Sequence, residues 1–541
     1  MKLPEVFAPV ASIMHSISPS QGPLVKTPSL LLFALRLAVV VPLLAPGAAA
    51  QSVPTEDEVL RRMREEGMTD RSHAYRLAQE LMDSIGPRLM GTSEQAAAVE
   101  WALAQYESFA IPARREQYGT WSGWRRGHTH AELIQPRRRD LDATMLAYSS
   151  GTDSAVEGEV VALPDLPDAA AYDRWLAEAR GKFVLVSPPE PTCRPDENLV
   201  AHARPETVDR LRALDDSIEA VWGGRFQRAG TGLAGRLDAA GVAGVLSSAW
   251  FQGWGVNKIQ SADTRQVPML DVSCEDNGLL HRLSENGQSP RMRLDAEAEH
   301  LGEVPAYNVI AELRGAELPD EYILLSAHFD SWDGASGATD NGTASVMMME
   351  AMRLLKETYP NPRRTILVGH WGGEEQGLIG SGAFAADHPE IVNNIHFGFN
   401  QDNGTWRIEA IRMQDFAAAQ PIVERWLRHI PGEISDTVAF TSPQQEGGSD
   451  HTSFTCHGAP VVRLQSNYPD YRQYTWHTNL DTLDKIIFDD LRNNATLAAM
   501  LAYLAAEEPE RLPRTREPQV NAQGEPQPRA PCRPARRSSG R

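Results

Sequence analysis

The sequence predicts an α/β protein in which helices cover both faces of a mixed, mostly parallel sheet. Short β-type runs alternate with helical stretches between about residues 307 and 506, and such alternation is typical of parallel strands joined by crossover helices. The chain has 541 residues, of which 42% are hydrophobic, so it can bury a sizeable core and is expected to form more than one folded unit. A block of short β-type runs, residues 143–298, separates two helical parts and predicts a smaller, β-rich inserted domain.

Residues 1–50 are expected to be a secretory signal peptide. An apolar run, "LLLFALRLAVVVPLLAPGAAA" (Leu30–Ala50), ends in three alanines before Gln51, and small residues after an apolar stretch are typical of a cleavage site. A membrane anchor is the alternative, although Arg36 and a proline interrupt the run. We therefore expect an exported protein, periplasmic or secreted, that is not attached to a membrane after cleavage.

The main domain is expected in two pieces, residues 51–142 and 299–508. The first piece contains amphipathic helices that divide near "IGPRLMGTS", where Thr92 or Ser93 can cap the second helix. The second piece begins with the β-type runs "YNVIAEL" and "EYILLSAHFD". The elements expected after them are helix 343–356, strand 365–368, helix 381–387, strand 395–400, helix 417–429, strand 460–464 and helix 489–506.

The inserted block consists of short β-type runs joined by turns, with one helix expected at residues 205–218. Residues 509–541 are rich in Pro, Arg and Gln and are expected to be disordered, because they contain little apolar surface to bury. The chain contains four cysteines, too scattered for a thiolate metal site, and Cys193–Cys274 is the disulfide we expect. The net charge of −20 disfavours a nucleic-acid partner, whose phosphates it would repel.

Histidine and carboxylate side chains follow four separate strands of the main domain. The carboxyl ends of parallel strands meet at one edge of a sheet, so these side chains are expected to converge there. Nitrogen and carboxylate oxygen ligands without a thiolate suit Zn²⁺ in an open, catalytic site. The residues concerned are His328, Asp330 and Asp340 after the first strand, Glu374 and Glu375 after the second, Asp402 after the third, and His477, Asp481 and Asp484 after the fourth.

Within this group, Asp340 is central enough to bridge two metal ions, and Asp330 is placed to fix the tautomer of His328. Glu374 and Glu375 are adjacent, so their side chains are expected to point in different directions and to have different roles. One would bind metal and the other would accept a proton from the attacking water. The residues alone do not assign the two roles.

The motifs around these residues resemble those of one peptidase family. "SAHFDSWDGASGATDNGTAS", "GGEEQGLIGS", "NQDNGT", "GGSDHTSF" and "WHTNLDTLDKI" occur in an order and at separations that resemble the co-catalytic dizinc exopeptidases. This group includes aminopeptidase Y, glutamate carboxypeptidase and, most similar, the carboxypeptidase Q-like peptidases. The resemblance covers residues 72–110 and 307–506. It implies two Zn²⁺ per chain, short peptide substrates, a protease-associated domain at residues 143–298, and a homodimer.

The resemblance also implies individual roles. It assigns His328 and Asp402 to one zinc, Glu375 and His477 to the other, Asp340 to both, and Glu374 as the general base. The implied activity is that of an exopeptidase of the aminopeptidase or dipeptidase type. Two alternatives share the scaffold: a glutaminyl-cyclase-like acyltransferase with one zinc, and a non-catalytic, receptor-like relative that has lost its ligands.

Several nearby residues have competing interpretations. His370 lies in an apolar strand and is better explained as a core residue than as a ligand. His451 matches a family loop and is one candidate to stabilise an oxyanion, and Tyr474 is the other. Asp481 and Asp484 are expected either to orient His477 or to cap the following helix.

Overall fold

The structure is a computed structural model that describes residues 57–402, 406–441, 444, 447–467, 469–521 and 523–540. The signal peptide expected at residues 1–50 lies outside the described residues. Within the described part, none of the helices combines the length and the apolar character needed to cross a membrane.

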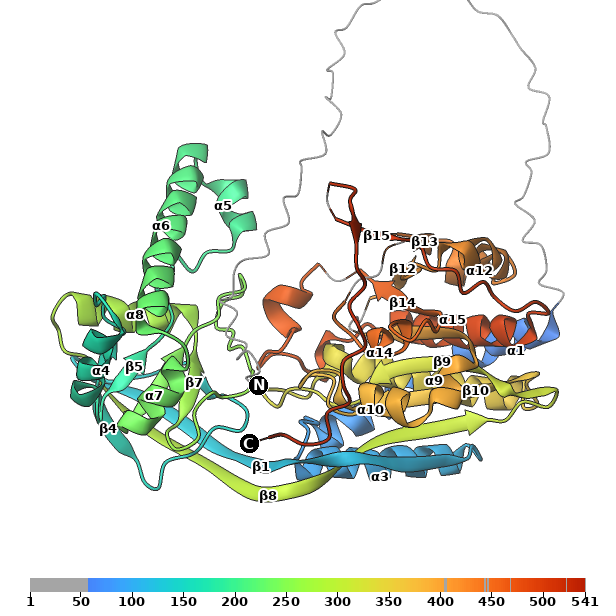
Figure 1. Ribbon diagram of the computed structural model, residues 1–541, viewed down its shortest axis with the longest axis horizontal. Helices are drawn as coiled ribbons and strands as arrows, with labels where there is room; N and C mark the ends of the chain where they lie inside the picture. The colour runs from blue at the N-terminus through green and yellow to red at the C-terminus, as the bar shows by residue number, and fades with distance from the viewer. Residues whose placement is uncertain are drawn as a thin grey trace, which may run out of the picture. The chain divides into compact units, whose positions relative to one another are not determined.

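A mixed sheet forms the centre of the main domain (Figure 1). Its strands are β8 (Arg291–Leu313), β9 (Leu318–His328), β10 (Arg364–Trp371), β11 (Ile395–Gln401), β12 (Ile408–Arg412), β13 (Ala439–Phe440) and β14 (Val461–Ser466). Their order is β13-β12-β14-β11-β9-β10-β8. The neighbours β10, β9, β11 and β14 pair in parallel, as do β12 and β13, whereas β8 is antiparallel to β10 and β12 is antiparallel to β14. The predicted mixed, mostly parallel sheet is therefore confirmed.

Helices cover both faces of this sheet because successive strand residues point to opposite sides. Ile323 and Leu325 of β9 pack into one core, which contains α1 (Glu58–Gly67), α9 (Thr343–Thr358) and α15 (Phe488–Glu507). Leu324, between them, packs into the opposite core with α10 (Ile379–Asp387) and α14 (His451–Thr455). The remaining helices of this domain are α2 (Ala74–Gln79), η1 (Glu80–Ile85), α3 (Ser93–Ser108), η2 (Ala338–Gly342), α11 (Pro389–Asn393), η3 (Ala417–Ala419), α12 (Gln420–Leu427), α13 (Gly432–Ser435), η4 (Tyr471–Thr475) and η5 (Leu483–Lys485).

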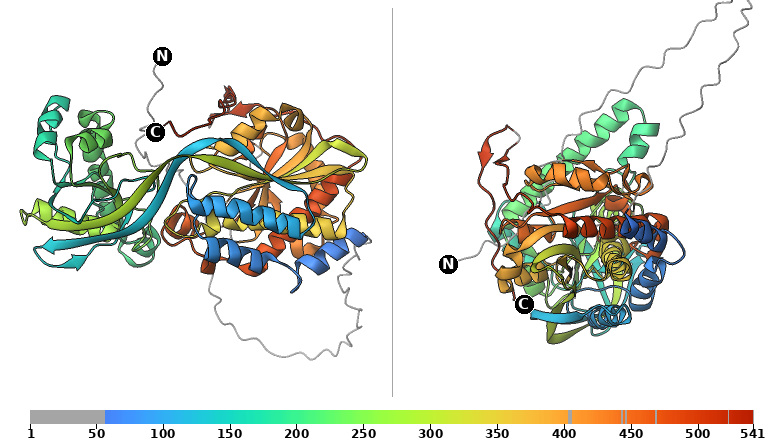
Figure 2. Two further views of the ribbon diagram at one scale, coloured as in Figure 1. Left: turned by 90° about the horizontal axis from the view of Figure 1, so that it is seen from below. Right: turned by 90° about the vertical axis from the view of Figure 1, so that its right-hand side faces the viewer.

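A long two-stranded ribbon connects the main domain to the insert. β1 (Ala113–Gln135) pairs antiparallel with β8 along almost its whole length, interrupted by several bulges (Figure 2). The sequence did not predict β1, because this segment is rich in Arg, Glu and His and lacks a regular alternation of apolar residues. The expected boundary at residue 299 therefore falls within β8, which runs on from one domain into the other, and the boundary at residue 142 falls between β2 (Arg139–Asp140) and β3 (Ala143–Met145).

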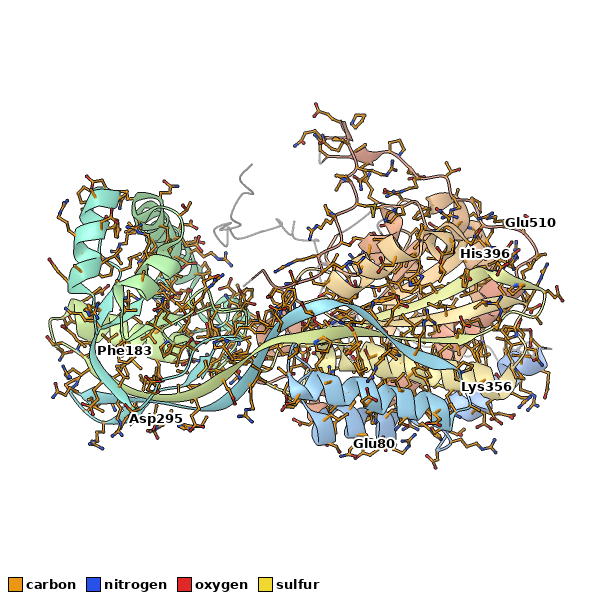
Figure 3. The ribbon with its side chains drawn as sticks, turned by 60° about the horizontal axis from the view of Figure 1, so that its bottom comes forward. Glu80, Phe183, Asp295, Lys356, His396 and Glu510 are labelled. Atoms are coloured by element: carbon orange, nitrogen blue, oxygen red, sulfur yellow. A yellow bond between two sulfur atoms is a disulfide. The ribbon has the colours of Figure 1, made fainter. Side chains whose placement is uncertain are left out.

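The insert is less β-rich than expected. Strands β4 (Val156–Ala162), β5 (Phe183–Leu185), β6 (Gly244–Ser247) and β7 (Met269–Val272) form a parallel sheet, with the antiparallel β3 (Ala143–Met145) at its edge. Its helices are α4 (Ala169–Glu178), α5 (Asp196–His202), α6 (Pro205–Ala229), α7 (Leu233–Ala240) and α8 (Cys274–Glu285). Phe183 is buried in the core of this domain (Figure 3). Of these helices only α6 was predicted, because the others are short and their apolar patterns resemble those of short strands.

Two disulfides join distant parts of the chain. The expected Cys193–Cys274 bond is present, with an S–S distance of 2.03 Å. A second bond joins Cys456 to Cys532, in the segment that we expected to be disordered.

The C-terminal segment, residues 509–541, differs from the expectation of disorder. Arg514 donates to the carbonyl of Gly458, and Arg537 makes a bidentate ion pair with Asp387. A short hairpin forms between β15 (Gln519–Val520) and β16 (Pro526–Gln527). Disorder was predicted because the segment has little apolar surface to bury. A disulfide and arginine hydrogen bonds instead hold it against the main domain.

Candidate metal centre

The first group of potential ligands gathers where β9 and β11 end. His328 is the last residue of β9 and Asp402 follows β11 directly, so the pairing of these two strands brings them together. Nε2 of His328 lies 3.3 Å from Oδ1 of Asp402 and 3.3 Å from Oδ1 of Asp340. All three side chains are buried.

The second group contains His477, Glu375 and again Asp340. Nε2 of His477 lies 3.0 Å from Oε2 of Glu375 and 3.4 Å from Oδ2 of Asp340. The two oxygens of Asp340 therefore face two different histidines. In each three-residue group the candidate ligand atoms lie within 4.8 Å of one another, so five side chains from distant parts of the sequence form two adjoining sites with one shared carboxylate.

These residues fit divalent cations. Oδ2 of Asp340 and Oε1 of Glu375 are buried, and neither has a hydrogen-bond partner among the described residues. A buried carboxylate oxygen without a donor is costly unless a positive charge compensates it. Imidazole nitrogens and carboxylate oxygens are the ligands that Zn²⁺ takes in catalytic sites. The donor set and its unpaired oxygens thus suit divalent cations such as Zn²⁺.

Asp330 is close to His328, but its carboxylate has a different main role from the one predicted. Nδ1 of His328 lies 3.1 Å from the main-chain carbonyl of Asp330 and 3.7 Å from its carboxylate. Since a carbonyl only accepts, it favours the tautomer with a proton on Nδ1 and leaves Nε2 for a metal. The Asp330 carboxylate instead accepts the main-chain N–H groups of Glu374 and Glu375, at 3.1 and 3.3 Å.

Glu374 lies beside the first group. Burial raises the pKa of its carboxyl well above the usual range, His328 lowers it, and the neighbouring Asp402 and Asp450 carboxylates raise it. Burial also raises the pKa of Glu375 well above its usual range, and Asp340 adds to the effect. The two adjacent glutamates differ in position: Glu375 lies against His477, whereas Glu374 belongs to neither three-residue ligand group.

Asp481 holds the main chain of Asp340. Its two carboxylate oxygens accept the N–H groups of Thr339 and Asp340, at 2.8 and 3.0 Å. Asp484 is exposed and pairs with Lys485. The structure therefore favours a third role over both predicted ones: Asp481 positions the shared carboxylate.

Arg88 is a buried residue of this centre that the sequence analysis missed. Its guanidinium donates to the carbonyls of Phe329, Ser336 and Gly337, at 2.7 to 2.8 Å, and so holds the loop between His328 and Asp340. Burial lowers the pKa of Arg88 to about 10, while the nearby carboxylates oppose this shift. An arginine between the apolar and glycine residues of "IGPRLMG" was the available signal.

The part of the chain that contains these ligands is similar to known peptidases. Residues 308–502, which span all five candidate ligands, match the family described as peptidase family M28. We call residues 308–502 the M28 domain, after this match. Carboxypeptidase Q of Mus musculus is 23% identical over 437 residues, covering 80% of this chain and 86% of the relative. The predicted family is confirmed.

Solved structures share the fold. The peptidase M28 precursor from Shewanella amazonensis SB2B superposes with a TM-score of 0.64 at 23% identity, covering 85% of this chain and 98% of that one. BSAP, a zinc aminopeptidase from Bacillus subtilis, gives a TM-score of 0.54 at 18% identity, covering 82% and 97%. The coverage extends beyond the M28 domain. The protease-associated identity of the insert stays a prediction.

The M28 domain also contains His451, Tyr474 and His370. His451 is buried at the start of α14, and the preceding Asp450 has a pKa raised to about 7 by burial. Tyr474 is partly buried in η4, just before His477. His451 and Tyr474 both stay candidates for the oxyanion role. His370 is a core residue, as predicted: it is fully buried, and its Nε2 lies 2.6 Å from the hydroxyl of Tyr106.

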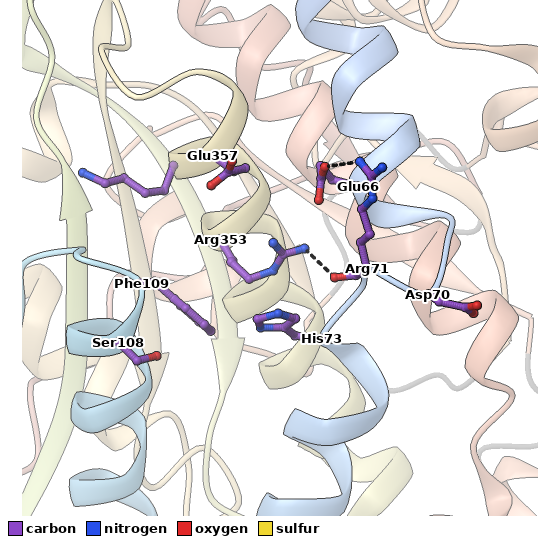
Figure 4. Close-up of a pocket in the computed structure, with 9 residues that line it drawn as sticks. Glu66, Asp70, Arg71, His73, Ser108, Phe109, Arg353 and Glu357 are labelled. Atoms are coloured by element: carbon purple, nitrogen blue, oxygen red, sulfur yellow. Dashed lines mark hydrogen bonds and ion pairs between the residues drawn. The ribbon is translucent and has the colours of Figure 1, made fainter.

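Three of the candidate ligands, Asp340, Glu375 and His477, line a small cavity together with Trp332, Gly337, Thr475, Thr478 and Asp481. A larger cavity of about 550 Å³ lies elsewhere, between α1, α3 and α9 (Figure 4). It is lined by residues of both charges, among them Glu66, Arg71 and Arg353, and Glu66 pairs with Arg71 at 2.7 Å. Because it contains none of the candidate ligands, the larger cavity is not the metal centre.

Proposed function

We propose that this protein is an exported, zinc-dependent exopeptidase that hydrolyses short peptides. The observation that carries the proposal is the pair of three-residue ligand groups sharing Asp340. The M28 match and the names of similar proteins, carboxypeptidase Q and a zinc aminopeptidase, support a peptidase that removes terminal residues or splits dipeptides.

His328, Asp402 and Asp340 would hold one Zn²⁺, and Glu375, His477 and Asp340 the other. Two Zn²⁺ ions, when bound, would supply Lewis acidity for the scissile carbonyl and the attacking water. Asp330 positions both glutamates through their N–H groups, and Asp481 positions Asp340. Each ligand is thus supported by a hydrogen-bonded neighbour or by the end of a strand.

Glu374 would act as the general base. It lies beside the ligand groups without belonging to either, so its carboxylate is free to take a proton from the attacking water and return it to the leaving amine.

Glu374→Gln tests this assignment. The variant should bind as much Zn²⁺ as the wild type and lose turnover by several orders of magnitude, of which general base catalysis alone accounts for about 10²–10⁴. Glu390→Gln, at an exposed glutamate that pairs with His388, is the matched control and should keep wild-type turnover. Unchanged turnover in the Glu374 variant would rule out this role.

The substrate is tested in the same preparation. We expect cleavage of dipeptides in preference to long unfolded protein, because the insert contacts the turn that carries His477 and would restrict access to the site. Comparing X-Ala with N-acetyl-X-Ala shows whether a free amine is recognised. One zinc per chain would favour a glutaminyl-cyclase-like acyltransferase, and metal binding without hydrolysis of any peptide would favour a receptor-like protein.

A further inference from the structure

The insert supplies main-chain partners for the turn that carries His477. The N–H of Ile259 donates to the carbonyl of His477 at 2.7 Å. Lys258 and Thr478 form an antiparallel bridge. Asn257 completes the contact, because its N–H binds the side-chain oxygen of Asn479 at 2.9 Å and its carbonyl accepts the N–H of Asn479 at 3.2 Å. A three-residue segment of the insert therefore pairs with residues 477–479.

Lys258 makes a second contact with the same turn. Its side chain is buried, and Nζ donates to the carbonyls of Arg472 and Trp476, at 2.9 and 2.5 Å. Nζ also lies 4.3 Å from the ring centroid of Phe251 and 4.8 Å from that of Trp476. Buried lysines are rare unless their charge is satisfied, and here carbonyl oxygens and aromatic faces satisfy it.

Together these contacts hold the main chain on both sides of His477. The Trp476 carbonyl belongs to the peptide unit before His477 and binds Lys258, whereas the His477 carbonyl belongs to the unit after it and binds Ile259. His477 has a φ of 55°, a conformation that non-glycine residues rarely adopt without support. The Trp476 ring also lies 4.2 Å from the His477 imidazole, centroid to centroid.

We propose that the insert positions His477 as a metal ligand, with Lys258 as the positioning residue. Metal binding at the group of Asp340, Glu375 and His477 then depends on the insert, whereas the group of His328, Asp340 and Asp402 receives no such contact from residues 257–259. This inference rests on the proposed function, because it assumes that both groups bind Zn²⁺. The insert is thereby a structural part of one metal site.

Lys258→Met tests the inference. Methionine has a similar length and can stay packed between the aromatic rings, but it donates no hydrogen bond. Titrating the metal-free protein with Zn²⁺ should show one site weakened by about 10–100-fold, as for other residues that support a metal ligand, and the other site unchanged. Lys182→Met is the control, since Lys182 pairs with Glu159 near the surface of the insert, and it should bind both ions normally.

Thermal unfolding of the metal-free variants shows whether they fold. If Lys258→Met does not fold, Lys258→Gln, whose amide can donate to one carbonyl, gives the same comparison. Two unchanged zinc affinities would overturn the inference, and so would an equal loss at both sites, which would indicate general destabilisation. A wild-type protein that binds two Zn²⁺ and cleaves peptides keeps the proposed function whatever the variant does. A wild-type protein with a single zinc would overturn both.

Discussion

Asp481→Asn should weaken the metal centre without touching a ligand. Asp481 is buried, and its two oxygens accept the N–H groups of Thr339 and Asp340 at 2.8 and 3.0 Å. Asparagine has one acceptor oxygen, and its NH₂ group would face the second N–H. A buried donor left without a partner costs about 1–3 kcal/mol, so the free energy of unfolding of the metal-free protein should fall by about that amount.

The same substitution should lower zinc affinity by about 10–100-fold, because Asp340 is shared by both ligand groups and a shift of its main chain affects both. Urea denaturation measures the free energy of unfolding, and competition with a chelator of known affinity measures the zinc affinity.

Asp484→Asn is the matched control in the same turn. Asp484 is exposed and pairs with Lys485, so its loss should change the free energy of unfolding by less than about 0.5 kcal/mol. Equal effects of the two substitutions would refute the assigned role of Asp481. A larger loss of zinc affinity in the Asp484 variant would instead support the orientation of His477 by Asp484.

Three further predictions concern the core, the C-terminal segment and the metals. Burial lowers the pKa of His370 to about 3; below pH 6.5 the unfolded state therefore takes up a proton that the folded state does not, and stability is lost as the pH falls. His370→Gln, which keeps an acceptor for Tyr106, should reduce this slope by about 1.4 kcal/mol per pH unit in urea denaturation between pH 6 and 4, and an unchanged slope contradicts the prediction. Cys532→Ser should speed proteolytic cleavage within residues 509–541 because it removes the bond to Cys456, while peptidase turnover stays the same; equal cleavage in both proteins would show that the hydrogen bonds suffice. Dialysis against a chelator should abolish turnover, which returns fully only after two equivalents of Zn²⁺; full recovery with one equivalent would exclude a two-ion mechanism.

The sequence predicted the parts of the protein whose properties are local. The strand that ends at Trp371 is buried on both faces, and its central residues, 366–368, form a hydrophobic run that needs no partner to be recognised. His328, Glu375 and Asp402 could be connected from sequence because parallel strands end at one edge of a sheet, whatever the connections between them. The motifs around them added the family.

Other features depend on contacts between residues far apart in the chain. β1 is polar along much of its length and is a strand only because β8 pairs with it. The sequence could not show that Asp481 binds the N–H of Asp340 and not His477. That contact depends on how two loops pack, and no local pattern encodes it.

Lys258 illustrates the same limit, since it lies more than 200 residues before the carbonyls that it binds. The sequence by itself determined the apolar strands and the longer helices of the main domain and the types of ligand. Only the tertiary structure decided which groups support those ligands. The physical reason is that hydrophobic periodicity reports whether a residue is buried, whereas hydrogen bonds and charge contacts depend on the position of a particular partner atom.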